Sequence, residues 1–311
     1  MSGRFIPDGV IPAVLLPFDS DLRIDESAYR SHLRDVTAVT GVSALTINGH
    51  SSEVHALSFD EQRQVLDISL DEIGDQIPLI CGVYADGSQE AAQLAKQAES
   101  AGAVCLLIFP SSVFLFGAQQ RPEMILNHFR VIAEATSLSM IVFNYPLAGG
   151  LGYTTETLLQ LAEDIPQVTA IKDLCNNPVQ HESNIRALHD IGRPFSILTT
   201  HSAWLMASLV MGVDGLLSGA GSVIADLQSK LWQAVQDQNL AEAQAINDRI
   251  WPISSVFYSD PFLDMHNRMK EALVILRLQQ NAYVRPPLLK LSDNEILKIR
   301  DGLMKGGLLV G

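Results

Sequence analysis

Lys172 is the residue of this chain whose type and position best suit covalent chemistry. It directly follows the apolar run Val168–Ile171, which we interpret as a buried strand. A lysine held among apolar side chains has a lowered pKa, and its neutral amine can attack a ketone to form an imine. The alternative is a surface pair between Lys172 and Asp173. The other lysines fall in predicted helices or in the C-terminal part of the chain: Lys96, Lys230, Lys270, Lys290, Lys298 and Lys305.

A second candidate segment, Asn48–Glu53, follows the predicted strand Ser43–Ile47. The hydroxyl groups of Ser51 and Ser52, together with backbone N–H groups at the start of a helix, suit a carboxylate. His50 lies in the same segment. An ordinary capped turn is the alternative interpretation.

Two more predicted strand ends carry side chains that can exchange protons or bind a ligand. Phe143, Asn144 and Tyr145 lie at the end of one strand, and His201 follows another. Phe143 and Tyr145 are two residues apart, so an extended backbone points both to the same side. His201 could act as an acid or base near neutral pH, or it could simply cap the next helix.

These side chains must be positioned by short apolar runs that alternate with longer helix-like stretches. Each run is continuous rather than alternating, which is typical of strands buried on both faces of a parallel sheet. The runs are Val10–Leu16, Ser43–Ile47, Pro78–Val83, Val104–Phe109, Met140–Phe143, Val168–Ile171, Phe195–Leu198 and Gly215–Leu217.

The intervening stretches carry helical periodicity and helix start signals. Thr154 or Thr155 before Glu156, and Ser58 before Asp60-Glu61, place caps and acids at helix N-termini. Eight strand–helix units predict an α/β fold, a (β/α)8 TIM barrel whose active site lies at the carboxyl ends of the strands. The rival is a doubly wound open sheet, but no Gly-rich phosphate loop follows the first run.

The chain stays helical after the eighth unit. We predict helices over Leu240–Tyr258, Phe262–Leu278 and Asn294–Lys305, with a turn at Arg285-Pro286-Pro287. We therefore expect residues 1–225 to form the barrel and residues 226–311 to form a C-terminal helical extension of the same domain.

Composition excludes several classes of partner. The 311 residues carry a formal net charge of -14, which repels nucleic acid and anionic membrane surfaces. The 3 cysteines lack C-x-x-C spacing, which argues against a disulfide framework and against a zinc site. The segment Met1–Phe5 lacks the pattern of a signal peptide, and no apolar run approaches the ~18 residues that span a bilayer. We expect a cytoplasmic protein with reduced thiols.

A set of short segments spread over nearly the whole chain forms a specific pattern. The segments are Gly9-Val10-Ile11-Pro12-Ala13, Gly49–Glu53, Asn144-x-Pro146, Ile171-Lys172-Asp173, Gly212-Val213-Asp214-Gly215 and Lys270-Glu271-Ala272-Leu273. Their order and spacing resemble the dihydrodipicolinate synthase / N-acetylneuraminate lyase family of class I aldolases. The resemblance implies a TIM barrel with a C-terminal helical extension, Lys172 as the Schiff-base residue and pyruvate or another 2-keto acid as substrate. It also implies no metal or organic cofactor, and a homo-oligomer, either tetramer or dimer.

The chain departs from the family where protons are handled. The family loop is usually Gly-(Thr or Ser)-Thr-Gly-Glu, whereas here it is Gly49–Glu53. Ser51 keeps the hydroxyl that binds the keto acid carboxylate, but His50 replaces a hydroxyl of the proton relay and Ser52 replaces a glycine. Phe143 stands at the position of the catalytic tyrosine.

Two further family features are missing. Pro110-Ser111-Ser112 replaces a Pro-Tyr-Tyr segment that carries another relay tyrosine, and Ala148 lies where synthase members place an arginine. We hypothesise that His50 or Tyr145 carries protons instead. The predicted catalytic residues are Lys172, His50 and Tyr145, and the predicted substrate-binding residues are Ser51, Ser52, Phe143, His201 and Leu216.

Three functions remain open at this point. The first is a lyase, aldolase or dehydratase, that acts on pyruvate or a 2-keto-3-deoxy sugar acid. The second is 4-hydroxy-tetrahydrodipicolinate synthase, which condenses pyruvate with aspartate semialdehyde, although the missing arginine and tyrosines argue against it. The third is a non-catalytic keto acid sensor, against which the retained Lys172 speaks because a buried lysine is costly without a role.

Overall fold

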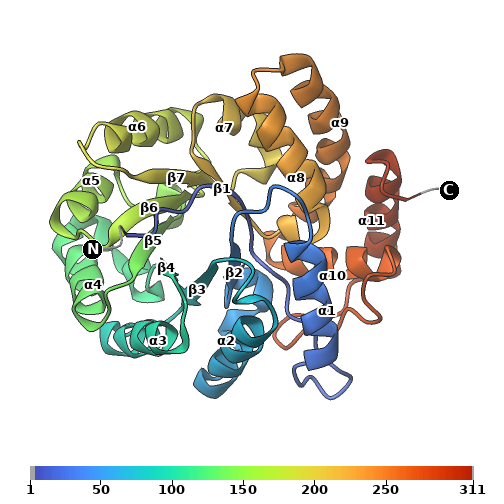
Figure 1. Ribbon diagram of the computed structural model, residues 1–311, viewed down its shortest axis with the longest axis horizontal. Helices are drawn as coiled ribbons and strands as arrows, with labels where there is room; N and C mark the ends of the chain where they lie inside the picture. Colours follow the sequence, from blue (N-terminus) through green and yellow to red (C-terminus); the bar gives the residue numbers. More distant parts are fainter. Residues whose placement is uncertain (1–3, 310–311) are drawn as a thin grey trace.

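The structure is a computed structural model that describes residues 4–309; residues 1–3 of the N-terminal segment and residues 310–311 lie outside it. Eight parallel strands pair in the order β1-β8-β7-β6-β5-β4-β3-β2. Parallel bridges Val10–Val42 and Ala13–Thr46 join β1 to the segment of β2, which closes the barrel seen in Figure 1. The strands are β1 (Gly9–Pro12), β2 (Leu45–Ile47), β3 (Leu79–Val83), β4 (Cys105–Ile108), β5 (Ser139–Asn144), β6 (Val168–Asp173), β7 (Ser196–Thr199) and β8 (Gly215–Ser218).

A helix follows each strand and covers the outside of the barrel (Figure 1). The predicted caps form: the Ser58 side chain accepts from the Glu61 N–H, and the Thr154 side chain accepts from the Thr157 N–H. The predicted TIM barrel is confirmed. The surrounding helices are α1 (Glu26–Thr37), α2 (Phe59–Ile73), α3 (Ser88–Ala101), α4 (Pro122–Ala135), α5 (Thr155–Asp164), α6 (Pro178–His189), α7 (Leu205–Val210) and α8 (Gly221–Gln236).

Strand ends differ from the predicted runs in two ways. The first apolar run continues to Leu16, but β1 ends at Pro12; Ala13 still forms one bridge to Thr46, whereas Val14, Leu15 and Leu16 are buried without a bridge to the sheet. Conversely, β5 and β6 extend beyond their apolar runs because Asn144 pairs in register with Asp173. An apolar run in the sequence therefore indicates that its residues are buried, whereas the length of a strand depends on where the neighbouring strand can pair with it.

Side chains of the strands alternate between two apolar clusters, one inside the barrel and one between the barrel and its helices. Ala170 belongs to the interior cluster, whereas its neighbour Ile171 belongs to the outer one. The same alternation places Leu217 inside and Leu216 outside. The interior cluster consists of Ile11, Ala13, Ala44, Ile80, Cys105, Leu107, Phe109, Ile141, Phe143, Ala170, Leu198 and Leu217.

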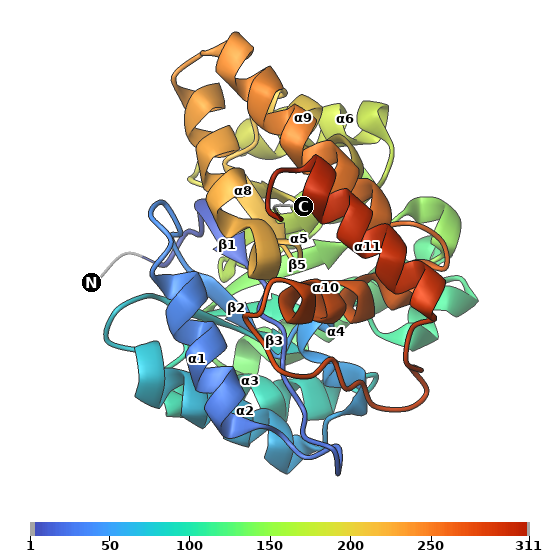
Figure 2. The same ribbon diagram turned by 90° about the vertical axis from the view of Figure 1, so that its right-hand side faces the viewer.

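The C-terminal part of the chain is helical, as predicted. Helix α8 runs across position 225, with non-helical backbone at Ile224. The predicted helix Phe262–Leu278 is shorter: a 3-10 turn, η7 (Phe262–Asp264), leads into α10 (Met265–Ile275). Helix α10 packs against α8, α9 (Leu240–Phe257) and α11 (Asp293–Lys305), as Figure 2 shows from the side. Within residues 4–309, no helix has the length and apolarity needed to cross a membrane.

A buried ion pair ties this extension to the loop after β2. The Glu53 carboxylate contacts Lys270 Nζ of α10 and accepts the Arg285 backbone N–H at 2.8 Å. Lys270 also donates to the Tyr283 carbonyl oxygen at 2.9 Å. Glu53 and Lys270 are both essentially inaccessible to solvent, and Glu53 adopts a positive φ of 53°. The extension therefore fixes the backbone of the loop that contains His50 and Ser51.

We predict that Lys270→Met destabilises the fold by about 3–5 kcal/mol, because Glu53 would be left as an uncompensated buried charge. Urea denaturation followed by circular dichroism measures the change. The double variant Glu53→Gln/Lys270→Met is the matched control, and it should recover part of the loss because no lone charge remains. Equal stability of the wild type and Lys270→Met would show that this pair does not hold the extension in place.

Candidate active site

Lys172 lies near the carboxyl end of β6 with its side chain on the interior face of the barrel. It pairs in register with Phe143 of β5, and Lys172 Nζ lies 4.1 Å from the centre of the Phe143 ring. The side chain is 7% exposed. Burial lowers the pKa of Lys172 to about 7, so a large fraction of the amine is neutral and nucleophilic at physiological pH.

His50 and Tyr145 form a hydrogen-bonded pair beside this lysine. His50 comes from the 3-10 turn η1 (His50–Ser52) after β2, Tyr145 follows β5, and His50 Nε2 lies 2.7 Å from the Tyr145 hydroxyl. Burial, followed by the nearby charge of Lys172, lowers the pKa of His50 to about 3. Burial raises the pKa of Tyr145 well above its usual value. Both groups are therefore neutral at pH 7, and the His50 tautomer decides whether the Tyr145 hydroxyl donates to Nε2 or the Nε2–H donates to the Tyr145 oxygen.

Aromatic rings surround the lysine and the His50–Tyr145 pair. The Phe143 ring lies 4.5 Å from Tyr145 and 5.3 Å from Phe109, between ring centres. The His50 ring lies 4.8 Å from Phe109, which also contacts Tyr84. Phe143 and Tyr145 lie on the same side of the backbone, as their spacing predicts. These rings keep water from the amine, which is the physical cause of its lowered pKa.

The hydroxyl groups of the two serines in the loop after β2 differ in their hydrogen bonds. Ser52 Oγ donates to the Val14 carbonyl oxygen at 2.9 Å, so its hydroxyl is already used to hold the loop. Ser51 is 1% exposed, and its Oγ has no hydrogen-bond partner within the described residues. A buried polar group without a partner is costly, and a ligand carboxylate would satisfy it.

Two predicted site residues lie away from the lysine. His201 stacks on Trp204 with ring centres 4.1 Å apart, and its Nε2 accepts the Asn176 backbone N–H at 3.1 Å. Its polar contacts therefore lie with the loop after β6 and with Thr199 of β7 rather than with Lys172. Leu216 points to the outer cluster between β8 and the helices. The structure brings together the side chains of Lys172, His50, Tyr145 and Phe143, with Ser51 in the same turn as His50, but not the side chains of His201 and Leu216.

His266 of α10 is a site residue that sequence reasoning missed. Its Nε2 faces Gly219, directly after β8, and a Cβ atom at Gly219 would approach it to 2.9 Å. Burial, and then the charges of His50 and Lys172, lower the pKa of His266 well below its ordinary value. No local signal marks this residue, because it lies in the extension and reaches the barrel mouth only through the packing of α10.

The sequence of this chain matches known proteins along almost its whole length. The Dihydrodipicolinate synthetase family matches residues 6–305. The 4-hydroxy-tetrahydrodipicolinate synthase of Chlorobium limicola is 30% identical over 99% of this chain and 100% of its own length. The protein of the same name from Neisseria meningitidis is 28% identical over 97% of this chain and 99% of its own length.

Solved structures agree with this assignment at the level of the fold. A prophage protein of the dihydrodipicolinic acid synthase family from E. coli, crystallised in complex with pyruvate, superposes with a TM-score of 0.89 at 22% identity, covering 97% of this chain and 99% of that one. Dihydrodipicolinate synthase from Thermotoga maritima gives a TM-score of 0.87 at 23% identity, covering 98% and 100%. The chain is therefore a divergent member of the dihydrodipicolinate synthetase family of class I aldolases and lyases.

Proposed function

We propose that this protein is a Schiff-base lyase, an aldolase or dehydratase, that acts on pyruvate or a 2-keto-3-deoxy sugar acid through an imine on Lys172. The observation that carries the proposal is the buried amine of Lys172, whose pKa of about 7 supplies a neutral nucleophile inside the barrel. The related E. coli protein was crystallised with pyruvate, which supports a 2-keto acid as the substrate class.

The substrate carboxylate is assigned to Ser51, whose buried Oγ lacks a partner. The Lys172 amine then adds to the C2 carbonyl and forms a carbinolamine. Loss of water from this adduct gives the imine, and the departing hydroxyl needs a proton. In an aldolase, the protonated imine accepts the electrons of the C3–C4 bond while the C4 hydroxyl loses its proton, and the resulting enamine is protonated at C3. In a dehydratase, the imine accepts the electrons of the C3–H bond after a base removes that proton, and the resulting enamine expels the protonated C4 hydroxyl as water. Hydrolysis of the imine then releases the product in either case.

The His50–Tyr145 pair is our candidate for moving these protons. With Tyr145 donating to His50 Nε2, the tyrosine oxygen can accept from a substrate hydroxyl; with His50 Nε2–H donating, the tyrosine proton is free for the substrate. The side chain of Phe143 cannot do this. The hydroxyl function of the family's Tyr-Asn-x-Pro segment is thus replaced two residues later, on the same face of the strand.

Ala148 favours the lyase over the biosynthetic synthase. It lies in the turn η5 (Leu147–Gly149), exposed, at the position where synthase members carry an arginine. Without that cation the carboxylate of aspartate semialdehyde lacks its partner. The synthase remains the second candidate because the Chlorobium limicola relative carries that name. A keto acid sensor is the third, and it would bind without turnover.

We also propose that the chain forms a homo-oligomer. Val113, Leu115 and Phe116 of the 3-10 turn η3 (Ser112–Phe116) are large apolar side chains exposed on the surface, and Phe116 is 90% exposed. Clustered exposed apolar side chains commonly mark a protein–protein contact.

The cysteines Cys81, Cys105 and Cys175 are buried free thiols, which supports a reducing, cytoplasmic location.

Borohydride trapping tests the central proposal. Pyruvate followed by borohydride should leave one reduced adduct, which peptide mapping places on Lys172, and Lys172→Met should give none. The variant should also melt roughly 2–5 °C higher at pH 7, because it removes a buried amine whose charge the unfolded chain retains. This stability gain should shrink as the pH rises toward 10.5, where the unfolded lysine also loses its proton. Absence of an adduct with a panel of 2-keto acids would favour the sensor.

We predict that the rate of imine formation depends on pH through Lys172 itself. Below about pH 7 the amine is protonated, so the rate should fall roughly tenfold per pH unit, and above pH 7 it should level off. Rates are obtained by incubating with pyruvate at each pH and trapping at one fixed pH. His50→Gln should keep the same midpoint, because the pKa of His50 is about 3. A midpoint near 10 would contradict the burial argument.

His50→Ala and Tyr145→Phe should each lower kcat on the true substrate by about 10²–10⁴-fold, because proton transfer loses its carrier. Turnover of sugar acids to pyruvate or to a dehydrated semialdehyde provides the assay. Tyr153→Phe is the matched control, since its buried hydroxyl has no hydrogen-bond partner within residues 4–309. Full turnover in both His50→Ala and Tyr145→Phe would exclude the pair as the proton carrier.

A further inference from the structure

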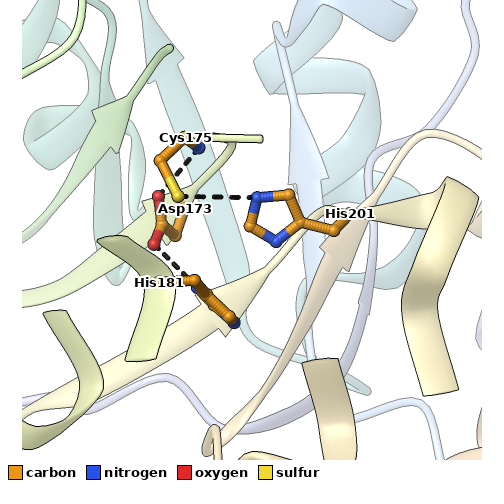
Figure 3. A group of neighbouring side chains, drawn as sticks. All are labelled: Asp173, Cys175, His181 and His201. Carbon is orange, nitrogen blue, oxygen red and sulfur yellow. Dashed lines mark hydrogen bonds and ion pairs between the residues drawn. The ribbon is translucent and has the colours of Figure 1, made fainter. Parts of the chain in front are cut away.

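Four potential metal ligands gather on the side of β6 that faces away from Lys172. They are Asp173 at the end of β6, Cys175 in the following loop, His181 on α6 and His201 after β7. All four are buried, and their ligand atoms lie within 4.8 Å of one another. Figure 3 shows Asp173 between Cys175 and His181, with the His201 ring turned toward the Cys175 sulfur.

Both histidines are oriented by hydroxyl groups behind them. His181 Nε2 lies 2.8 Å from Ser208 Oγ, and His201 Nδ1 lies 3.2 Å from Thr199 Oγ1. In each ring, one nitrogen is therefore hydrogen-bonded to a hydroxyl group outside the cluster, and the other nitrogen faces the centre of the cluster. Metal-binding histidines are oriented in this way, through a hydrogen bond between the second ring nitrogen and a neighbouring oxygen.

The hydrogen bonds around His181 call for a cation between its ring and Asp173. Ser208 Oγ donates its proton to Thr199 Oγ1 at 2.7 Å, so it accepts from the Nε2–H of His181. His181 Nδ1 then faces Asp173 Oδ2 at 2.8 Å. A nitrogen lone pair repels a carboxylate at that distance unless a proton or a metal ion lies between them.

The positions of Cys175 and His201 favour a metal ion over a proton between His181 and Asp173. Cys175 Sγ and His201 Nε2 lie 3.8 Å apart and point to the same centre. A proton shared by His181 and Asp173 would need neither of them. We propose that Asp173, Cys175, His181 and His201 form a binding site for a divalent cation of the zinc type.

The geometry and the charge both suit such an ion. Zinc bonds of roughly 2.0–2.3 Å place neighbouring ligand atoms about 3.2–3.8 Å apart, so the side chains need to move by less than about 1 Å. Metal binding displaces the Cys175 thiol proton to solvent, and the resulting thiolate and the Asp173 carboxylate offset the two positive charges of the ion. Asp173 Oδ1 is already held by Asn144 Nδ2 and the Cys175 N–H, both at 3.0 Å. Binding costs the hydrogen bond from the Asn176 N–H to His201 Nε2 and that from the Cys175 thiol to the Asn177 carbonyl oxygen, whereas Asn184 Nδ2, 3.1 Å from Asp173 Oδ2, still holds the carboxylate.

This site is structural rather than catalytic, because four protein ligands leave no open position. It would join β6, α6 and β7 one residue beyond Lys172 and so fix the strand end that carries the amine. The absence of C-x-x-C spacing led us to expect no zinc site, but these ligands come together only when β6 and β7 pair.

Metal binding by the full-length protein provides the test. Chelator-treated wild type should take up one equivalent of zinc by elemental analysis and gain several degrees in melting temperature. With Co²⁺ it should show intense tetrahedral d–d bands and a thiolate-to-cobalt charge-transfer band. Cys175→Ala should lose the charge-transfer band, whereas the matched variant Cys105→Ala, altered inside the barrel, should keep it.

Two outcomes would overturn the proposal. The first is wild-type protein that binds neither zinc nor Co²⁺. The second is a Co²⁺ spectrum without a sulfur band, or with a sulfur band unchanged in Cys175→Ala, because Cys175 is then not a ligand. The wild-type spectrum alone decides the first outcome, so the test survives if Cys175→Ala fails to fold.

Discussion

The site depends on one constraint, that an amine must be held inside an apolar barrel without a carboxylate to neutralise it. A counter-ion beside Lys172 would keep it charged and unreactive, so the polar groups of the same strand must point elsewhere. The pleat of β6 meets this requirement, since Lys172 faces the interior while the next residue, Asp173, faces the helices. A single peptide step thus separates a nucleophile from a carboxylate. The closed, eight-stranded sheet then supplies the aromatic surroundings that exclude water.

Local sequence patterns were sufficient to predict the barrel and the burial of Lys172 at the end of one of its strands. Eight apolar runs predict the barrel strongly, because a strand buried on both faces must be apolar throughout. Lys172 was conspicuous as a lysine at the end of one of these runs. The strand ends were less predictable, since residues such as Leu16 are buried without pairing. The position of a residue at a strand end also does not reveal which way its side chain points. Leu216 and His201 occupy suitable positions, but their side chains point away from the lysine.

Contacts between segments that are distant in the sequence could not be predicted from local patterns. His266 approaches the barrel mouth from the extension, and Asp173, Cys175, His181 and His201 are gathered by the pairing of β6 with β7. The loss of the family tyrosine at Phe143 could be read from sequence. His50 and Tyr145 could also be named as candidate replacements, but their 2.7 Å contact could not be predicted, because it joins the loops after β2 and β5.

The link between Glu53 and the extension has a consequence for the order of events during synthesis. The loop that carries His50 and Ser51 is held by Lys270 and by the backbone of Arg285, more than two hundred residues downstream. A nascent chain whose eight strands have left the ribosome therefore has its lysine in place before the loop is anchored. The complete pocket is assembled only when almost the last segment emerges, so partly synthesised chains should be unable to capture cellular keto acids.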